Sequence, residues 1–146
     1  MKMKKKIVAL SMSLLILGGA LTGVYAETSV LSGNVYNTVR HRNIPGGGGE
    51  SYNTFYGSKK ATTGPFATFL MTERDALLGN FGGLITSSKV YASEMVGLSL
   101  NNPVLAQEYG CSKGTVYFTV AGSAAIEPSN SCCVTMKFSA DNLKPE

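Results

Sequence analysis

The chain of 146 residues contains no tryptophan, one histidine and only 15% charged residues. Because tryptophan offers the largest ring for stacking, its absence weakens a glycan-binding interpretation. The single histidine means that any mechanism that needs an imidazole must use His41. Beyond residue 26, no apolar run approaches the roughly 20 residues that a membrane-spanning helix needs, so we expect no permanent span.

A surplus of basic residues is also missing once the first 26 residues are set aside. The formal net charge is +4, but Lys2, Lys4, Lys5 and Lys6 supply that surplus, and residues 27–146 are balanced. Nucleic-acid binding and the strongly cationic class of membrane-lytic peptides are therefore not expected.

Motifs that carry catalytic or cofactor chemistry are absent as well. There is no nucleophile elbow or metal-binding helix, and the glycine run at 46–49 lacks the Lys-Ser/Thr of a phosphate loop. Cys111, Cys132 and Cys133 do not have the paired spacing of zinc ligands. The sequence therefore predicts no catalytic residue, metal or cofactor. A small secreted hydrolase that uses His41 is an alternative, although we favour a solvated strand-end position for this residue.

Residues 1–26 have the layout of a secretory signal peptide. Lysines near the start precede an apolar stretch at 7–17, and Val24-Tyr25-Ala26 forms a small-residue end suited to cleavage. The leader resembles those of Gram-positive bacteria. We expect cleavage after Ala26 and a secreted, extracellular product in which residues 27–146 form a single β domain.

The remaining composition favours a mainly β fold. Ser, Thr, Asn and Gly are abundant in residues 27–146, which favours turns and pleated strands over long helices. Apolar and polar residues alternate at 95–100, 115–121 and 133–139, and this predicts three half-buried strands. Further strands are expected at 34–42, 51–56, 65–72 and 84–91. About seven strands predict a small two-layer antiparallel β-sandwich, with a small β-barrel as the alternative.

Two short helical turns are expected between the strands. Thr72 and Asp75 have the spacing of a capping box, and Asn102 followed by Pro103 is typical of a helix start. Neither turn is long enough to organise the fold. The glycine run at 46–49 is interpreted as a flexible linker or a hairpin tip.

Three cysteines cannot all pair within one chain. The alternation at 133–139 places Cys132 on the core face and Cys133 on the outer face. A disulfide from Cys111 to Cys132 or Cys133 is weighed evenly against three reduced thiols, because export permits disulfides without requiring them. If 115–121 and 132–139 form a hairpin, that disulfide needs a bend in the chain.

Aromatic and basic side chains in the first half of the mature chain form the predicted binding surface. Rings beside cations can hold an anionic polymer, a glycan or a protein by stacking and charge pairing. The residues assigned to this surface are Tyr36, Arg40, Arg42, Tyr52, Tyr56, Lys59 and Lys60. Arg40 and Arg42 also flank His41, and we expect them to lower its pKa by disfavouring a further positive charge.

The leading hypothesis is therefore a secreted protein that binds an extracellular protein, a glycan or a cell-envelope polymer, including as an antagonist or toxin of other cells. An alternative of a different class is a self-assembling matrix or fibre subunit. Neutral windows at 61–72, 76–88 and 114–126 suit edge-to-edge pairing of strands and so favour that alternative.

Overall fold

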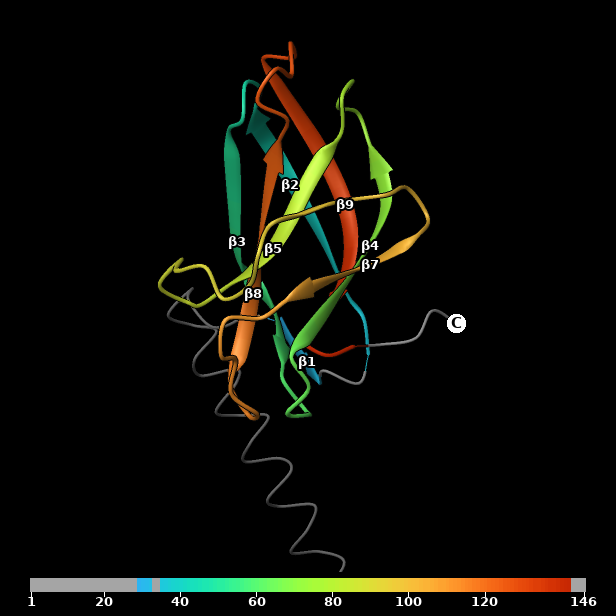
Figure 1. Cartoon of the computed structure of the whole chain (residues 1–146). Coiled ribbons are helices and arrows are strands. Elements are labelled where there is room, and N and C mark those ends of the chain that lie inside the picture. Colours follow the sequence, from blue (N-terminus) through green and yellow to red (C-terminus); the bar gives the residue numbers. More distant parts are fainter. Residues whose placement is uncertain (1–28, 33–34, 143–146) are drawn as a thin grey trace, which may run out of the picture.

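The computed structural model describes residues 29–32 and 35–142, which form two β-sheets packed face to face (Figure 1). The first sheet has the strand order β1-β3-β8-β5-β6, and the second has the order β2-β9-β4-β7. The strands are β1 (Ser29–Ser32), β2 (Asn37–Pro45), β3 (Glu50–Lys59), β4 (Phe66–Arg74), β5 (Asn80–Ile85), β6 (Val96–Gly97), β7 (Pro103–Gln107), β8 (Val116–Ser123) and β9 (Ser131–Ser139). The predicted two-layer β-sandwich is thus confirmed, and the sheets do not close into a barrel. The predicted signal peptide lies outside the described residues.

The strand pairs are antiparallel, except that β1 lies parallel to β3 at one edge. β8 occupies the middle of the first sheet and β9 lies in the second, so the hairpin of 115–121 with 132–139 that was considered for the cysteines does not form. β9 has an apolar inner face, but β8 is not half-buried as predicted. Tyr117 and Ala121 belong to the core between the sheets, and Phe118 and Val120 belong to a second cluster with Ile85 and Met95, so β8 is buried on both faces.

The core lies between the two inner faces. In β9, Val134, Met136 and Phe138 are buried while the residues between them are more exposed, as the alternation predicts. The Phe138 ring stacks on Phe69 of β4 with 6.4 Å between ring centres. From the opposite sheet, Leu84 of β5 packs into the same cluster.

Neither expected helical turn is helical in the structure, because residues 75–79 form the loop after β4 and residues 103–107 are strand. Thr72 lies inside β4, and Pro103 begins β7, which pairs with β4. The predicted capping signals are local, and the ladders that β4 forms with β9 and β7 on its two sides override them. Of the strand expected at 95–100, only Val96–Gly97 is strand, as β6. The strand expected at 84–91 lies earlier in the chain, at Asn80–Ile85, as β5.

Candidate functional site

The structure distributes the predicted aromatic and basic surface over different faces of the sandwich. Arg40 and Arg42 alternate with buried residues of β2 and lie on the outer face of the second sheet. Tyr52, Tyr56 and Lys59 are exposed on β3, in the first sheet. These residues do not form one continuous surface, because the β2–β3 turn carries the chain from one sheet to the other.

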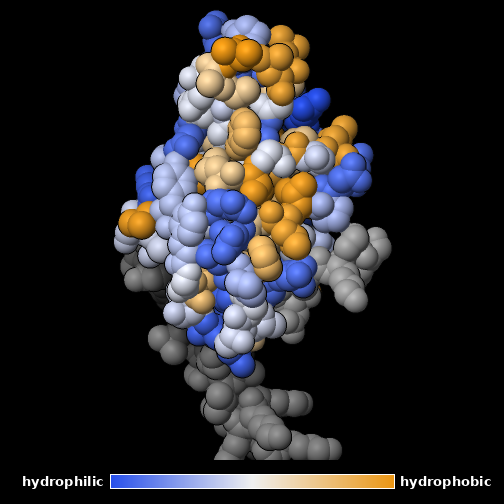
Figure 2. Space-filling model, in the orientation of Figure 1, coloured by the Kyte–Doolittle hydropathy of each residue, from blue (hydrophilic) through white to orange (hydrophobic). Residues whose placement is uncertain are grey.

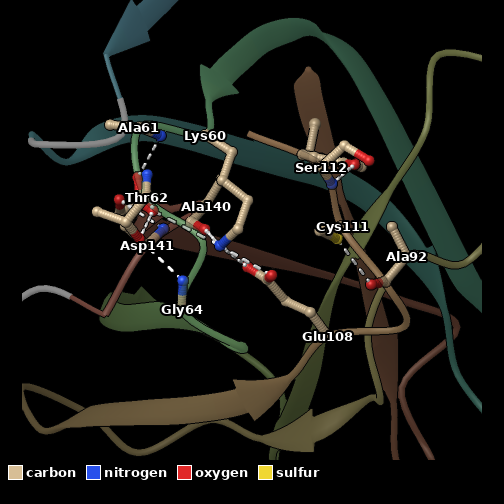
Figure 3. Close-up of polar contacts among 12 residues, drawn as sticks. Lys60, Ala61, Thr62, Gly64, Ala92, Glu108, Cys111, Ser112, Ala140 and Asp141 are labelled. Carbon is tan, nitrogen blue, oxygen red and sulfur yellow. Dashed lines mark hydrogen bonds and ion pairs between the residues drawn. The ribbon is translucent and has the colours of Figure 1, made fainter. Parts of the chain in front are cut away.

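Two residues of the predicted surface are not exposed. Tyr36 is half-buried just before β2. Lys60 is 1% exposed, and its ammonium group lies against the carboxylates of Glu108 and Asp141. The expectation that Lys60 is exposed is therefore wrong. Lys60 directly follows β3, where its side chain enters the interior at one end of the sandwich (Figure 3).

His41 was expected at a solvated strand end, but the structure buries it within β2. Its Nε2 lies 2.8 Å from the Thr119 hydroxyl of β8, and its Nδ1 lies 3.4 Å from the Ser51 hydroxyl of β3. Burial lowers the pKa of His41 to about 4, against a smaller opposing effect of the hydrogen bond with Ser51. The direction agrees with the expectation, but the cause is burial and not the flanking arginines. An enclosed imidazole gives no support to a hydrolase centred on His41.

Aromatic residues on the outer face of the first sheet gather around Glu50. Tyr52 donates a hydrogen bond to Glu50 Oε2 at 2.7 Å, and Tyr91 donates to Oε1. The Lys89 ammonium lies 5.8 Å from the centre of the Tyr52 ring. The hydrogen bond to Glu50 raises the pKa of Tyr52, and burial together with the same carboxylate raises that of Tyr91. The cluster holds the loop after β5 on the sheet, and the two tyrosine hydroxyls and the Glu50 carboxylate are hydrogen-bonded to one another.

A shallow polar depression lies on the outer face of the second sheet. It is lined by Arg40, Glu73, Arg74, Asp75, Cys133 and Thr135. Glu73 accepts a hydrogen bond from the Thr135 hydroxyl at 3.2 Å, and Asp75 accepts one from the Cys133 N–H at 2.6 Å. The ion pairs among the described residues involve neither arginine. The depression thus contains two guanidinium groups and two carboxylates.

Three strongly exposed aliphatic side chains lie at one end of the sandwich. Ile126 is 81% exposed, Leu77 is 70% exposed and Leu78 is 52% exposed. Leu77 and Leu78 belong to the β4–β5 loop, and Ile126 belongs to the β8–β9 loop. Both loops lie at the upper end in Figure 1, where Figure 2 shows apolar residues at the surface. We call Leu77, Leu78 and Ile126 the apolar tip.

Glu127 holds the two loops of the apolar tip together. Its carboxylate accepts hydrogen bonds from the backbone N–H groups of Leu77 at 3.1 Å and Leu78 at 2.8 Å, and from the Ser129 hydroxyl at 2.7 Å. These bonds, foremost that from the Leu78 N–H, hold the pKa of Glu127 below its usual range. The backbone amides of both leucines are thus satisfied internally while their side chains project into solvent.

The β2–β3 turn is fixed against the β8–β9 loop. The Gly47 N–H donates to the Glu127 carbonyl at 3.0 Å, and the Gly48 N–H donates to the Ala124 carbonyl at 2.8 Å. A β-carbon on Gly46 would lie 1.9 Å from the Ser129 carbonyl oxygen, so this approach requires glycine. The glycine run, interpreted as a flexible linker or hairpin tip, instead joins the two sheets and braces the end that carries the apolar tip.

Sequence reasoning missed the apolar tip. Leu77 and Leu78 were expected to belong to a helical turn, and Ile126 to an ordinary loop. A usable signal was present, because Leu78 directly precedes Gly79 in one loop and Ile126 lies two positions before Pro128 in the other. The exposure of these residues depends on which loops meet, and that information is not local.

The cysteines are all free among the described residues. Cys132 is buried and Cys133 is partly exposed, as the alternation predicts. Cys132 pairs with Ile44 beside the β2–β3 turn, whereas the Cys111 thiol bonds the Ala92 carbonyl near Glu108 at the other end of the sandwich (Figure 3). Most of the length of β9, roughly 20 Å, separates them, so the disulfide considered from sequence is wrong. Burial raises the pKa of Cys111 to about 11.

Comparison with known proteins identifies no relative. No protein-family model matches the chain, and no curated protein or solved structure is significantly similar to it. Over the described ranges, no helix is long and apolar enough to cross a membrane, and no group of His, Cys, Asp and Glu side chains is arranged to hold a metal. A function must therefore be argued from the surface geometry.

Proposed function

We propose that this protein is an extracellular binding protein that docks reversibly on a lipid bilayer through its apolar tip. The observation that carries the proposal is the exposure of Leu77, Leu78 and Ile126 on loops that Glu127 fixes. Large aliphatic groups on mobile loops can fold back onto the protein. Here the hydrogen bonds keep them exposed, and a persistent apolar projection indicates an interaction site.

The chemistry of the apolar tip favours a bilayer over a protein partner. The side chains are purely aliphatic, and the backbone amides of Leu77 and Leu78 are occupied by Glu127. Because these amides do not depend on water for their hydrogen bonds, moving the surface from water into hydrocarbon leaves few polar groups without a partner. The side chains also project from two loops rather than lining a groove, and a fluid acyl layer accommodates projections without a matching cavity.

Arginines beside the apolar tip suit the level of the lipid headgroups. Arg74 ends β4 immediately before the β4–β5 loop, and its guanidinium lies 3.4 Å from the position that a β-carbon on Gly79 would occupy. Arg40 lines the same polar depression. With no ion pair to either side chain among the described residues, both are available for lipid phosphates.

The expected affinity is modest. Transferring the exposed parts of three aliphatic side chains from water to hydrocarbon contributes about 4 kcal/mol. This is comparable to a weak single anchor and predicts reversible attachment. Export by the expected signal peptide supports the proposal, because it brings the chain to membranes outside the cytoplasm. An antagonist or toxin would use the apolar tip to dock on the membranes of other cells.

Vesicle co-sedimentation tests the proposal. We expect the protein to bind vesicles of phosphatidylcholine with phosphatidylglycerol, and the triple variant Leu77→Ser, Leu78→Ser, Ile126→Ser to bind at least about tenfold more weakly, because the transferred apolar surface is lost. The matched control is Val90→Ser, Leu100→Ser, Leu105→Ser, which removes three exposed aliphatic residues elsewhere. The control should bind as the unmodified protein does.

Two outcomes would overturn the proposal. In one, the unmodified protein binds neither neutral vesicles of phosphatidylcholine alone nor anionic vesicles that also contain phosphatidylglycerol. In the other, the tip variant and the control lose binding equally. Circular dichroism of each variant establishes that the sandwich is retained, since all six substituted side chains are exposed and contribute little to the core.

A further inference from the structure

Three charged side chains are enclosed together at the end of the sandwich opposite the apolar tip (Figure 3). Lys60 directly follows β3, Glu108 follows β7 and Asp141 follows β9, so three separate segments supply them. The exposed fractions of these side chains are 0% for Lys60, 2% for Glu108 and 3% for Asp141. We call Lys60, Glu108 and Asp141 the buried triad.

The ammonium of Lys60 contacts both carboxylates. Its Nζ lies 2.8 Å from Glu108 and 3.5 Å from Asp141 Oδ1, and it donates a further hydrogen bond to the Ala140 carbonyl at 2.8 Å. The Lys60 nitrogen is thus held beside an oxygen of the Asp141 carboxyl group, and it becomes a nucleophile once it loses a proton.

The charges of the buried triad do not balance. One ammonium faces two carboxylates, and no other ion pair reaches them among the described residues. Removing charged groups from water is costly, and a buried ion pair recovers only part of that cost. A reaction that turns one ammonium and one carboxylate into a neutral amide would remove two of the three buried charges.

We infer that Lys60 and Asp141 are the site of an intramolecular amide bond, formed between Lys60 Nζ and Asp141 Cγ with Glu108 as the proton carrier. The Lys60 ammonium passes one proton to the Asp141 carboxylate, and the resulting amine attacks Cγ. Glu108 takes a second proton from the attacking nitrogen and passes it to the departing hydroxyl, which leaves as water. The products are one amide, one water molecule and the original Glu108 carboxylate, so no oxidant, reductant or co-reactant is required.

The surroundings of Asp141 and Glu108 suit these steps. The N–H groups of Ala61 and Thr62 donate to the two Asp141 oxygens at 2.9 and 3.0 Å, and the Thr62 hydroxyl donates to Oδ1. The same donors can stabilise the negative charge on the tetrahedral intermediate. Burial raises the pKa of Glu108 against the opposing effect of Lys60, which favours its acceptance of a proton.

The donors to Asp141 also act against the first step. Burial alone would raise the pKa of Asp141, but the hydrogen bonds from Thr62 and Ala61 hold it below its usual range. Asp141 therefore begins as a carboxylate, and its protonation by Lys60 is the step that must be reached before attack. We accordingly expect slow formation after folding, since only the folded chain brings Lys60 and Asp141 together.

The amide would give this chain a covalent staple. It would join the end of β3 in the first sheet to the end of β9 in the second, and enclose most of the sandwich in one loop. The structure has no disulfide among the described residues, so no other covalent link performs this role there.

Mass spectrometry of the intact chain under denaturing conditions tests the inference. We expect a mass about 18 Da below that calculated for the determined N-terminus, because one water molecule is lost. Proteolytic mapping should find the peptide containing Lys60 joined to the peptide containing Asp141, with no tryptic cleavage after Lys60. Lys60→Arg should restore the full mass, while Lys59→Arg, a change at the exposed neighbour, should keep the deficit. Glu108→Gln should slow formation by at least about a hundredfold.

The unmodified chain decides the question even where a variant fails to fold. A full mass after prolonged incubation of the folded protein would overturn the inference. So would a deficit that mapping assigns to a cyclic imide at Asp141-Asn142, or one that persists in Lys60→Arg. An unchanged rate in Glu108→Gln would exclude Glu108 as the proton carrier. None of these outcomes depends on vesicle binding.

Discussion

At the scale of single residues, His41 links the two sheets through hydroxyl groups and not through charge. The imidazole of β2 reaches Thr119 in β8 and Ser51 in β3, and the ring is 1% exposed. A protonated imidazole at this position would place an uncompensated positive charge in the core. The neutral ring therefore belongs to the stable fold, and protonation should destabilise it.

We expect the free energy of unfolding to fall by about 3 kcal/mol as the pH drops from about 6.5 to about 4. The folded-state pKa of His41 is lowered, so the unfolded chain binds the proton first, and the stabilisation present above pH 6.5 is lost as the pH falls. Urea unfolding at several pH values measures the effect, with His41→Gln as the comparison.

The difference between the unmodified protein and His41→Gln is the informative quantity in that experiment. Glu108, whose pKa burial raises, shifts stability in the opposite direction, because its contribution is lost as the pH rises. Both proteins share this effect, so it cancels in the comparison. Parallel pH curves for the two proteins would contradict the assignment to His41.

At the scale of elements, the loops at the end that carries the apolar tip act as one unit. We expect Glu127→Ala to raise the hydrogen exchange rates of the Leu77 and Leu78 amides by roughly tenfold or more, because their acceptor is removed. Vesicle binding should weaken as well, since the side chains are no longer held out.

Glu94→Ala is the matched control for that experiment. Glu94 Oε1 accepts a hydrogen bond from the Gln107 N–H at 2.9 Å, so the variant also removes a carboxylate acceptor of a backbone amide, in another part of the molecule. Its effect should be confined to Gln107. Unchanged exchange at Leu77 and Leu78 in Glu127→Ala would show that the loops do not depend on Glu127.

The strand order also bears on self-assembly. The neutral windows at 61–72, 76–88 and 114–126 include β4, β5 and β8, and each of these strands has a neighbour on both sides. In the second sheet one edge is β2, where Arg40 and Arg42 are exposed, and charge on an edge opposes pairing with another chain. The neutral windows therefore do not support edge-to-edge pairing, and they were the only sequence feature that favoured a matrix or fibre subunit.

At the scale of the whole molecule, the proposed docking has a defined orientation. In that orientation the apolar tip and Arg74 would face the bilayer, while the buried triad lies at the far end of the sandwich. Because Arg40 and Arg74 would lie near the headgroups, they should contribute mainly on anionic membranes.

We expect Arg40→Gln, Arg74→Gln to weaken binding to anionic vesicles by roughly tenfold or more while leaving binding to neutral vesicles unchanged, because each arginine near an anionic surface contributes about 1 kcal/mol. Titration with vesicles of the two compositions measures this. Lys59→Gln, Lys113→Gln removes the same charge from exposed positions elsewhere and should retain both affinities. An equal loss in the two double variants would indicate a general effect of net charge.

The sequence by itself determined the fold class and most of the strands, and in β9 it also determined the face that each residue takes. Alternation in 115–121 and 133–139 depends only on the two-residue repeat of a β-strand, so β8, β9 and the buried position of Cys132 were predictable. The burial of β8 on both faces was not predictable, because distant residues such as Ile85 and Met95 cover its second face. Alternation does not specify which sheet a strand joins. The hairpin of β8 with β9 considered from sequence does not form for that reason, and of the two states weighed for the cysteines the structure has the three free thiols.

Only the tertiary structure decided which distant residues meet. Lys60, Glu108 and Asp141 come together because three strands end on the same side, and Glu127 reaches Leu77 and Leu78 across about 50 positions of the sequence. Each residue alone resembles an ordinary surface charge or loop apolar residue. Burial and exposure are set by the packing of the two sheets, and a local sequence pattern contains no record of that packing.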